Sequence, residues 1–168
     1  NASYVKNVVR DYSLALDNLA GKYPELYERG SFGKVRGGFT SDTAKTFNRG
    51  YTQLFVDGRR GKWAAMDAAK SMGEEIGRIS GISRDRSVLT VSLSRRDIVL
   101  NNGDGFSFVS RNGDVCGFRG DVCDGNSIKS RPVEGIYPGA TLYRNINAAF
   151  EKELDRNACT RMLDVTVS

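Results

Sequence analysis

Histidine is absent from the 168 residues of this chain, and that absence excludes several kinds of chemistry. Ser-His-Asp triads, Cys-His pairs, histidine-ligated zinc and imidazole general bases all require a side chain that the sequence does not supply. Chemistry performed by this chain alone would have to use a carboxylate, a cysteine thiolate, a lysine or a borrowed cofactor. The acidic set Asp114, Asp121 and Asp124 lacks the spacing and the terminal glutamate of a calcium loop. We therefore expect no catalytic residue, metal or cofactor here, although the part this chain plays in an enzyme stays open.

Long apolar segments are also missing. No stretch approaches the ~18 consecutive apolar residues of a membrane-spanning helix, and no apolar run follows a basic start as in a signal peptide. We therefore expect a cytoplasmic chain with no membrane partner. The sequence opens with Asn1-Ala2-Ser3 rather than an initiator methionine, and a β-like pattern begins at residues 162–167, just before its end. These two ends suggest a fragment of a longer protein.

Cysteine is scarce, and the three cysteines, Cys116, Cys123 and Cys159, do not form a Cys-x-x-Cys motif. Zinc and redox sites usually show that spacing. Buried reduced thiols are therefore favoured, and they fit a reducing compartment. A disulfide between Cys116 and Cys123 is the alternative.

The first 75 residues have the patterns of helices and of one glycine-rich loop. Apolar residues recur every three or four positions from Ser3 to about Leu19, which predicts an amphipathic helix whose apolar face packs against another element. Residues 30–41 are rich in glycine and basic residues but lack the P-loop motif, so an ordinary loop is favoured over a phosphate site. A second helix is predicted for residues 42–58, and residues 64–75 form a short helix-prone segment.

From residue 76 onward, short alternating segments are separated by turn residues, which is typical of a small β-sandwich or barrel. Asn-Gly and Asp-Gly pairs, and the Pro138-Gly139 pair, supply the backbone angles that tight turns need. Phe106 and Phe108 alternate in phase, and the core is favoured for them over stacking on nucleic-acid bases. The strands are predicted at residues 76–82, 87–93, 104–110, 114–123, 127–133 and 140–145.

These patterns predict an α+β fold. A helical N-terminal arm, residues 1–75, is expected to pack on a six-stranded, mainly antiparallel β-barrel, residues 76–145. Residues 146–168 are expected to form a C-terminal helix, with Ala149, Phe150 and Leu154 on its apolar face, and the start of a further strand. Closing the sheet into a barrel would remove its exposed edges.

Basic residues are concentrated in one part of the chain, because residues 45–96 contain eleven lysines and arginines against five acids. Such charge attracts an anionic partner, and phosphate contacts dominate nucleic-acid affinity, but a solvated surface and another acidic partner stay open. Adjacent Glu74 and Glu75 are interpreted as surface ion-pair partners rather than as an acid–base pair. The predicted partner contacts are Arg49, Arg59, Arg60, Lys62, Arg78, Arg95 and Arg96.

Five stretches together resemble a known family. "TFNRGYTQLFVDG", "DAAKSMGEEIGRI", "NNGDGFSFV", "GFRGDV" and "YPGATLYRNINAAFEKEL" occur in the order seen in the collagenase-like domain that follows the catalytic region in long members of peptidase family U thirty-two. The resemblance runs from about residue 5 to the end of the chain. The residues that carry it are Phe47, Asn48, Arg49, Gly50, Tyr51, Lys70, Ser71, Gly73, Gly77, Gly103, Asp104, Pro138, Gly139, Tyr143, Arg144 and Asn145. Ala69 stands where the family usually has proline.

The resemblance implies a non-catalytic accessory domain of a larger enzyme. In that family the catalytic part is a separate barrel-like α/β domain, and relatives are linked to collagen degradation or to hydroxylation of ribosomal or transfer RNA. We therefore expect the catalytic domain of the same parent chain as one partner, and RNA or an acidic or peptide substrate as another. Direct proteolysis through Cys116, Cys123 or a Ser71-Lys70 pair, and a purely structural scaffold, are the alternatives.

The phrases in the strand region are also similar to the second domain of translational GTPases, which raises the expectation of RNA contact. Gly50 lies inside a predicted helix, where glycine costs roughly 1 kcal/mol relative to alanine. We expect a close backbone approach there to offset that cost. Phe47, Tyr51 and Phe55 should pack inward, and Asn48 and Arg49 should be held by loops of the barrel.

Overall fold

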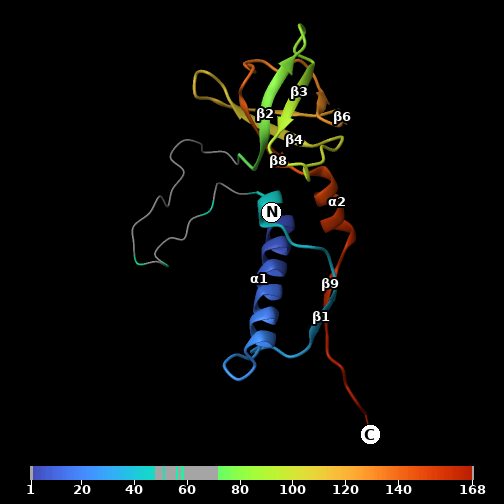
Figure 1. Cartoon of the computed structure of the whole chain (residues 1–168). Coiled ribbons are helices and arrows are strands. Elements are labelled where there is room, and N and C mark those ends of the chain that lie inside the picture. The colour runs from blue at the N-terminus through green and yellow to red at the C-terminus, as the bar shows by residue number, and fades with distance from the viewer. Residues whose placement is uncertain (1, 48–50, 52–55, 57, 59–71, 168) are drawn as a thin grey trace. The chain divides into compact units, whose positions relative to one another are not determined.

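A computed structural model describes residues 2–47, 51, 56, 58 and 72–167. These residues divide into two compact units. The first unit comprises residues 1–43 together with 150–168, and the second comprises residues 44–149. Figure 1 shows the helices and strands of each unit along the chain. No helix in the described part of the chain has both the length and the apolar character that crossing a membrane requires.

The first unit contains helix α1 (Ala2–Lys22) and a two-stranded antiparallel ribbon of β1 (Lys34–Gly37) and β9 (Cys159–Met162). It also holds most of helix α2 (Ala148–Arg156). Its small core consists of Phe39, Phe150 and Leu154, so the prediction that the last two belong to the apolar face of the C-terminal helix is confirmed.

Asn7 anchors α1 within the first unit. Its side-chain amide donates to the carbonyl oxygen of Asp42 at 2.7 Å and accepts from the Asp42 backbone N–H at 3.0 Å. Asn7 is the buried residue of this helix. The predicted helix is confirmed, but Val5, Val9 and Tyr12 of its apolar face, which were expected to pack, are exposed in the described part of the chain. The loop predicted at residues 30–41 contains strand β1, which pairs with β9 near the other end of the chain.

The second unit is built on one curled antiparallel sheet of seven strands (Figure 1). The strand order is β5-β4-β8-β2-β3-β7-β6. Each of the six predicted strand segments contains a strand, so the α+β class and the antiparallel sheet are confirmed. The strands are β2 (Glu74–Ile82), β3 (Val88–Leu93), β4 (Gly105–Val109), β5 (Val115–Arg119), β6 (Val122–Asp124), β7 (Ser127–Lys129) and β8 (Thr141–Ile146).

The seventh strand arises because the predicted strand at 114–123 is interrupted after Arg119. The two residues of the interruption, Gly120 and Asp121, donate backbone hydrogen bonds to different parts of the sheet. The Gly120 N–H donates to the carbonyl of Asp104 beside β4, at 2.9 Å, whereas the Asp121 N–H donates to the carbonyl of Lys129 on β7, at 2.8 Å. β5 and β6 lie at opposite ends of the strand order, so this short link draws the two edges together and curls the sheet.

Apolar side chains from the strands and loops of the second unit form its core. Phe106 and Phe108 are fully buried there, which confirms their predicted place in the core. Their rings pack against Phe118 with centroid separations of 5.3 and 6.3 Å. The rest of this core is Ile76, Ile79, Leu89, Val91, Ile98, Leu100, Ile128, Val133, Ile136, Ala140 and Leu142.

Two glycines of the family motif occupy positions where any other residue would be strained. Gly77 has a φ of +151°, and a Cβ there would lie 2.1 Å from the carbonyl oxygen of Ser92. Gly73 has a φ of +82°, and its Cβ would lie 2.1 Å from the carbonyl oxygen of Arg144. Both glycines therefore allow neighbouring strands to approach β2 closely.

The segment predicted as a second helix is described only in part. Thr43–Lys45 form a 3-10 helix. Phe47 and Tyr51, which were expected to pack inward, are 44% and 65% exposed. Asn48, Arg49, Gly50 and Phe55 lie outside the described residues, as do Arg59, Arg60, Lys62, Lys70 and Ser71.

Candidate nucleic-acid interface

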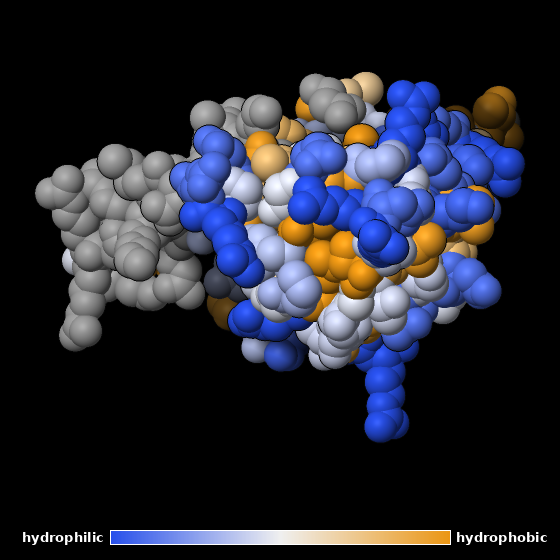
Figure 2. Space-filling view, turned by 90° about the horizontal axis from the view of Figure 1, so that it is seen from above, coloured by the Kyte–Doolittle hydropathy of each residue, from blue (hydrophilic) through white to orange (hydrophobic). Residues whose placement is uncertain are grey.

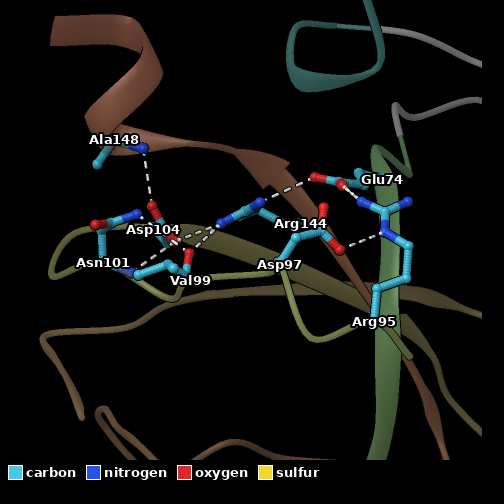
Figure 3. Close-up of polar contacts among 8 residues, drawn as sticks. All are labelled: Glu74, Arg95, Asp97, Val99, Asn101, Asp104, Arg144 and Ala148. Carbon is cyan, nitrogen blue, oxygen red and sulfur yellow. Dashed lines mark hydrogen bonds and ion pairs between the residues drawn. The ribbon is translucent and has the colours of Figure 1, made fainter. Parts of the chain in front are cut away.

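A buried arginine organises one end of the curled sheet (Figure 3). Arg144 on β8 lies in register with Glu74 on β2, and its Nη2 is 2.9 Å from Oε2 of Glu74. Its Nη1 is 3.3 Å from Oδ2 of Asp104 and donates to the carbonyl of Val99 at 2.7 Å. The three charged side chains are at most 8% exposed, so each charge depends on its partners.

Asp104 connects this arginine to the neighbouring backbone. Its Oδ1 accepts from the N–H of Ala148, at 2.8 Å, and its Oδ2 accepts from the N–H of Asn101, at 3.0 Å. The carboxylate therefore caps the first residue of α2 and holds the loop before β4. Asp104 and Arg144 are among the residues that carry the family resemblance, and their contacts hold strands, a loop and a helix end together.

The expectation for Glu74 was wrong, because it is a buried residue at the start of β2 rather than a surface acid. Its second oxygen, Oε1, lies 2.7 Å from Nη2 of Arg95, and Arg95 Nε lies 3.3 Å from Oδ1 of Asp97. The hydrogen bond that Arg95 donates to Glu74 raises the pKa of Arg95, and the negative charge of Asp97 raises it further. Glu75 is exposed, so adjacent Glu74 and Glu75 do not converge on one point.

The described cysteines are free, and one of them is a poor nucleophile. Burial, reinforced by the charge of Asp104, raises the pKa of the Cys123 thiol to about 11. Cysteine attacks as the thiolate, so Cys123 would be almost entirely in its unreactive form at neutral pH. Among the described residues, no three histidine, cysteine, aspartate or glutamate side chains group in a way that could hold a metal ion.

The predicted partner contacts that the structure describes are Arg78, Arg95 and Arg96. Arg78 is exposed on β2, opposite Ser92 and Thr141 on the flanking strands. Arg96 is exposed after β3 and forms no ion pair with a described residue. Arg95 is engaged by Glu74 and Asp97. The structure thus leaves Arg78 and Arg96 more accessible to an anion than Arg95.

Net positive charge is concentrated before the sheet. Residues 74–149 contain ten basic and nine acidic residues, whereas residues 45–70 contain six basic and two acidic residues. The sheet therefore contributes little of the formal charge of +5. Anion binding by the sheet would therefore depend on how its basic side chains are grouped locally rather than on its net charge.

Arg119 and Arg131 show such an arrangement, which the sequence interpretation did not include. They line one groove of about 740 Å³ in the second unit. The only sequence signal was the "GFRGDV" stretch, which contains Arg119. Figure 2 shows one face of the molecule, on which apolar surface is surrounded by hydrophilic side chains. The remaining lining residues of the groove are Asn102, Gly103, Gly117, Phe118, Asp121, Ser130 and Pro132.

The chain is similar to the 23S rRNA 5-hydroxycytidine C2501 synthase of Escherichia coli (strain K12), with 30% identity over 174 aligned residues. The match covers 98% of this chain but 26% of the relative, so the chain spans about a quarter of that protein's length. No family model matches the chain, and no solved structure matches it. The name of the relative denotes RNA modification, which gives no support to the expected hydrolase activity. The likeness to the second domain of translational GTPases stays a prediction.

Proposed function

We propose that this chain is a non-catalytic, RNA-binding accessory domain of a larger cytoplasmic RNA-modifying protein related to peptidase family U thirty-two. The observation that carries the proposal is the similarity along 98% of the chain to part of an enzyme named for modifying ribosomal RNA. The catalytic domain of the same parent chain is the second proposed partner. Collagenase-like proteolysis is not part of the proposal.

The chemistry of the described residues supports an accessory role. The buried carboxylates of Glu74 and Asp104 are committed to Arg144 and to backbone N–H groups. Cys123 is held in its thiol form by its raised pKa. These groups stabilise a fold and are not placed to transfer a proton or attack a substrate.

The distribution of charge supports RNA as the ligand. The excess of basic residues in 45–70 directly precedes a sheet that presents Arg78 and Arg96 to solvent. Cationic side chains near a polyanion release its condensed counterions, and this release drives binding at low salt. The proposed contacts are Arg49, Arg59, Arg60, Lys62, Arg78 and Arg96, with Arg95 positioned by its ion pairs.

Fluorescence anisotropy with a labelled single-stranded RNA across a salt series tests this function. We expect affinity to fall steeply as salt rises. The triple variant R59Q/R60Q/K62Q should reduce the slope of log affinity against log salt by about 2, because each cation on a single strand contributes about 0.7. K34Q/K152Q/R156Q removes the same charge from the first unit and serves as the matched control. The proposal is contradicted if the wild-type chain does not bind the RNA, or if its affinity for the RNA does not change with salt concentration.

A further inference from the structure

The groove that contains Arg119 and Arg131 lies where the curled sheet is not closed by hydrogen bonds. One side is residues 117–119 of β5, and the other is residues 130–132, which follow β7. β5 stands at one end of the strand order, and the β7–β6 pair stands at the other. The groove of about 740 Å³ therefore opens at the seam between the two edges. Its volume lies within the ~300–1,000 Å³ typical of small-molecule sites.

From this geometry we propose that the seam holds one unpaired nucleotide of a bound RNA. The inference rests on the proposed RNA-binding function and deepens it by assigning a specific site. A nucleotide needs a cation for its phosphate, an apolar surface for its base and hydrogen-bonding groups for the edge of the base. The seam supplies all three.

The cations are two arginines from opposite sides of the groove. Arg119 and Arg131 form no ion pair with any residue that the structure describes, and both are exposed. Among the described lining residues, Asp121 is the one carboxylate, so positive charge prevails over negative charge there. A guanidinium can donate two parallel hydrogen bonds to a phosphate, which makes arginine suited to this task.

The apolar surface comes from Phe118. This side chain is half-buried, and the buried rings of Phe106 and Phe108 support it from the core. It also lines the groove. An aromatic ring held rigidly in this way can contact a base without first losing conformational freedom.

Hydrogen-bonding groups come from backbone and side chain. Because β5 is an edge strand, its outer N–H and C=O groups have no ladder partner within the described sheet. The Asn102 side chain is fixed by its Oδ1, which accepts from the Cys123 N–H at 2.7 Å. Its Nδ2 has no acceptor within hydrogen-bond distance among the residues described, so it can donate to a ligand.

An extended peptide added to β5 would use the same backbone edge. Two unpaired arginines against one carboxylate favour a polyanion over such a peptide, because leaving these cations without a counter-charge in a filled groove would cost free energy. A single nucleotide also matches the short seam, which is bounded by the Gly120–Asp121 link at the point where β5 ends.

Gly117 offers a direct steric test. Among the described residues, a Cβ at this position would meet only the carbonyl oxygen of Phe106, at 3.5 Å, which is an ordinary van der Waals contact. Valine suits a strand and would occupy part of the groove. We expect G117V to weaken binding of a labelled ten-nucleotide single-stranded RNA by about tenfold, as loss of a stacked base does, with little change in binding of the same sequence as a duplex.

R119Q and R131Q test the charges. Each should weaken single-stranded RNA binding by several-fold and lower the slope of log affinity against log salt by about 0.7. R84Q is the matched control, because Arg84 is an exposed arginine of the same unit outside the groove lining. It should leave both quantities nearly unchanged.

The outcomes separate this inference from the proposed function. If the wild-type chain does not bind RNA, the proposed function and the inference both fail. If it binds but G117V, R119Q and R131Q all behave like R84Q, the groove is not the site and the proposed function stands. Equal losses for single strand and duplex would overturn the assignment of an unpaired nucleotide.

Amide chemical shifts of the wild-type chain provide a test that does not depend on the folding of a variant. Shifts at residues 117–119 and 130–131 that move with the single-stranded RNA support the site. Shifts that move with an extended acidic peptide but not with RNA would overturn it in favour of strand addition.

Discussion

Glu74 and Arg144 face each other across the β2–β8 ladder, and their side chains meet at 2.9 Å with almost no exposure to solvent. Glu74 also holds the exposed Arg95, so one carboxylate joins a buried cation and a surface cation. The same acid thus offers two ion pairs that differ in burial. Their comparison measures what burial does to an ion pair in this fold.

Removing the buried cation of Arg144 should strongly destabilise the folded chain. Arg144→Met leaves Glu74 and Asp104 buried without their partner, and we expect the free energy of unfolding to fall by about 3–5 kcal/mol. Arg95→Gln removes the exposed partner of the same carboxylate and should cost less than about 1 kcal/mol, since exposed pairs are weak. Urea unfolding followed by circular dichroism measures both. Equal losses for the two variants would contradict the structural role of Arg144.

Gly77 and Gly81 on β2 form a matched pair. Gly77→Ala would place a Cβ 2.1 Å from the Ser92 carbonyl oxygen at a φ of +151°, so we expect a loss of about 2 kcal/mol or more. At Gly81 the Cβ would lie 3.4 Å from Thr90 without an unusual φ. Gly81→Ala should therefore be neutral or stabilising by up to about 1 kcal/mol. Thermal unfolding of the two variants measures this difference. Similar melting temperatures would contradict the close approach of the Ser92 carbonyl to Gly77.

Asp85 should titrate at unusually low pH. Hydrogen bonds from Ser83 and then Ser87 lower its pKa from 3.8 to about 2. Because the folded pKa lies below the unfolded one, the resulting stabilisation is complete above about pH 4 and is lost as the pH falls toward 2. A carboxyl NMR titration should show this midpoint. Ser83→Ala should raise it toward 3.8, whereas Ser92→Ala should leave it in place.

Cys123 should alkylate slowly. Its thiol pKa is raised to about 11, chiefly by burial, so the fraction of reactive thiolate at pH 8 is small. We expect the iodoacetamide rate at this residue to keep rising up to about pH 11, as followed by peptide mass spectrometry with Cys116→Ser and Cys159→Ser present. Fast labelling of Cys123 at pH 7 would show that the thiol is activated and would reopen a nucleophilic role.

Local patterns predicted the strands well because their signals are short-range. Asn-Gly and Asp-Gly turns mark the ends of strands that the structure confirms, and alternation placed Phe106 and Phe108 in the core. The break at Gly120 was not predicted. It results from hydrogen bonds to Asp104, directly before β4, and to Lys129 on β7, and these two strands are distant in the strand order.

The candidate site was harder to predict than the fold. The density of basic residues pointed to residues 45–96, whereas Arg119 and Arg131 lie outside that window and line one groove only because the sheet curls. Glu74 was interpreted as a surface acid because nothing local distinguishes it from Glu75. Its partner Arg144 is brought opposite it by strand pairing across about seventy residues of chain.

By itself, the sequence determined the class of fold, the order of the strands along the chain and the lack of imidazole chemistry, since turn residues, alternation and composition act locally. Tertiary structure alone decided which charges are buried together and which face solvent. It also decided that a groove opens where two strand edges meet. Those outcomes depend on pairing between segments far apart in the chain, and local pattern carries no information about that pairing.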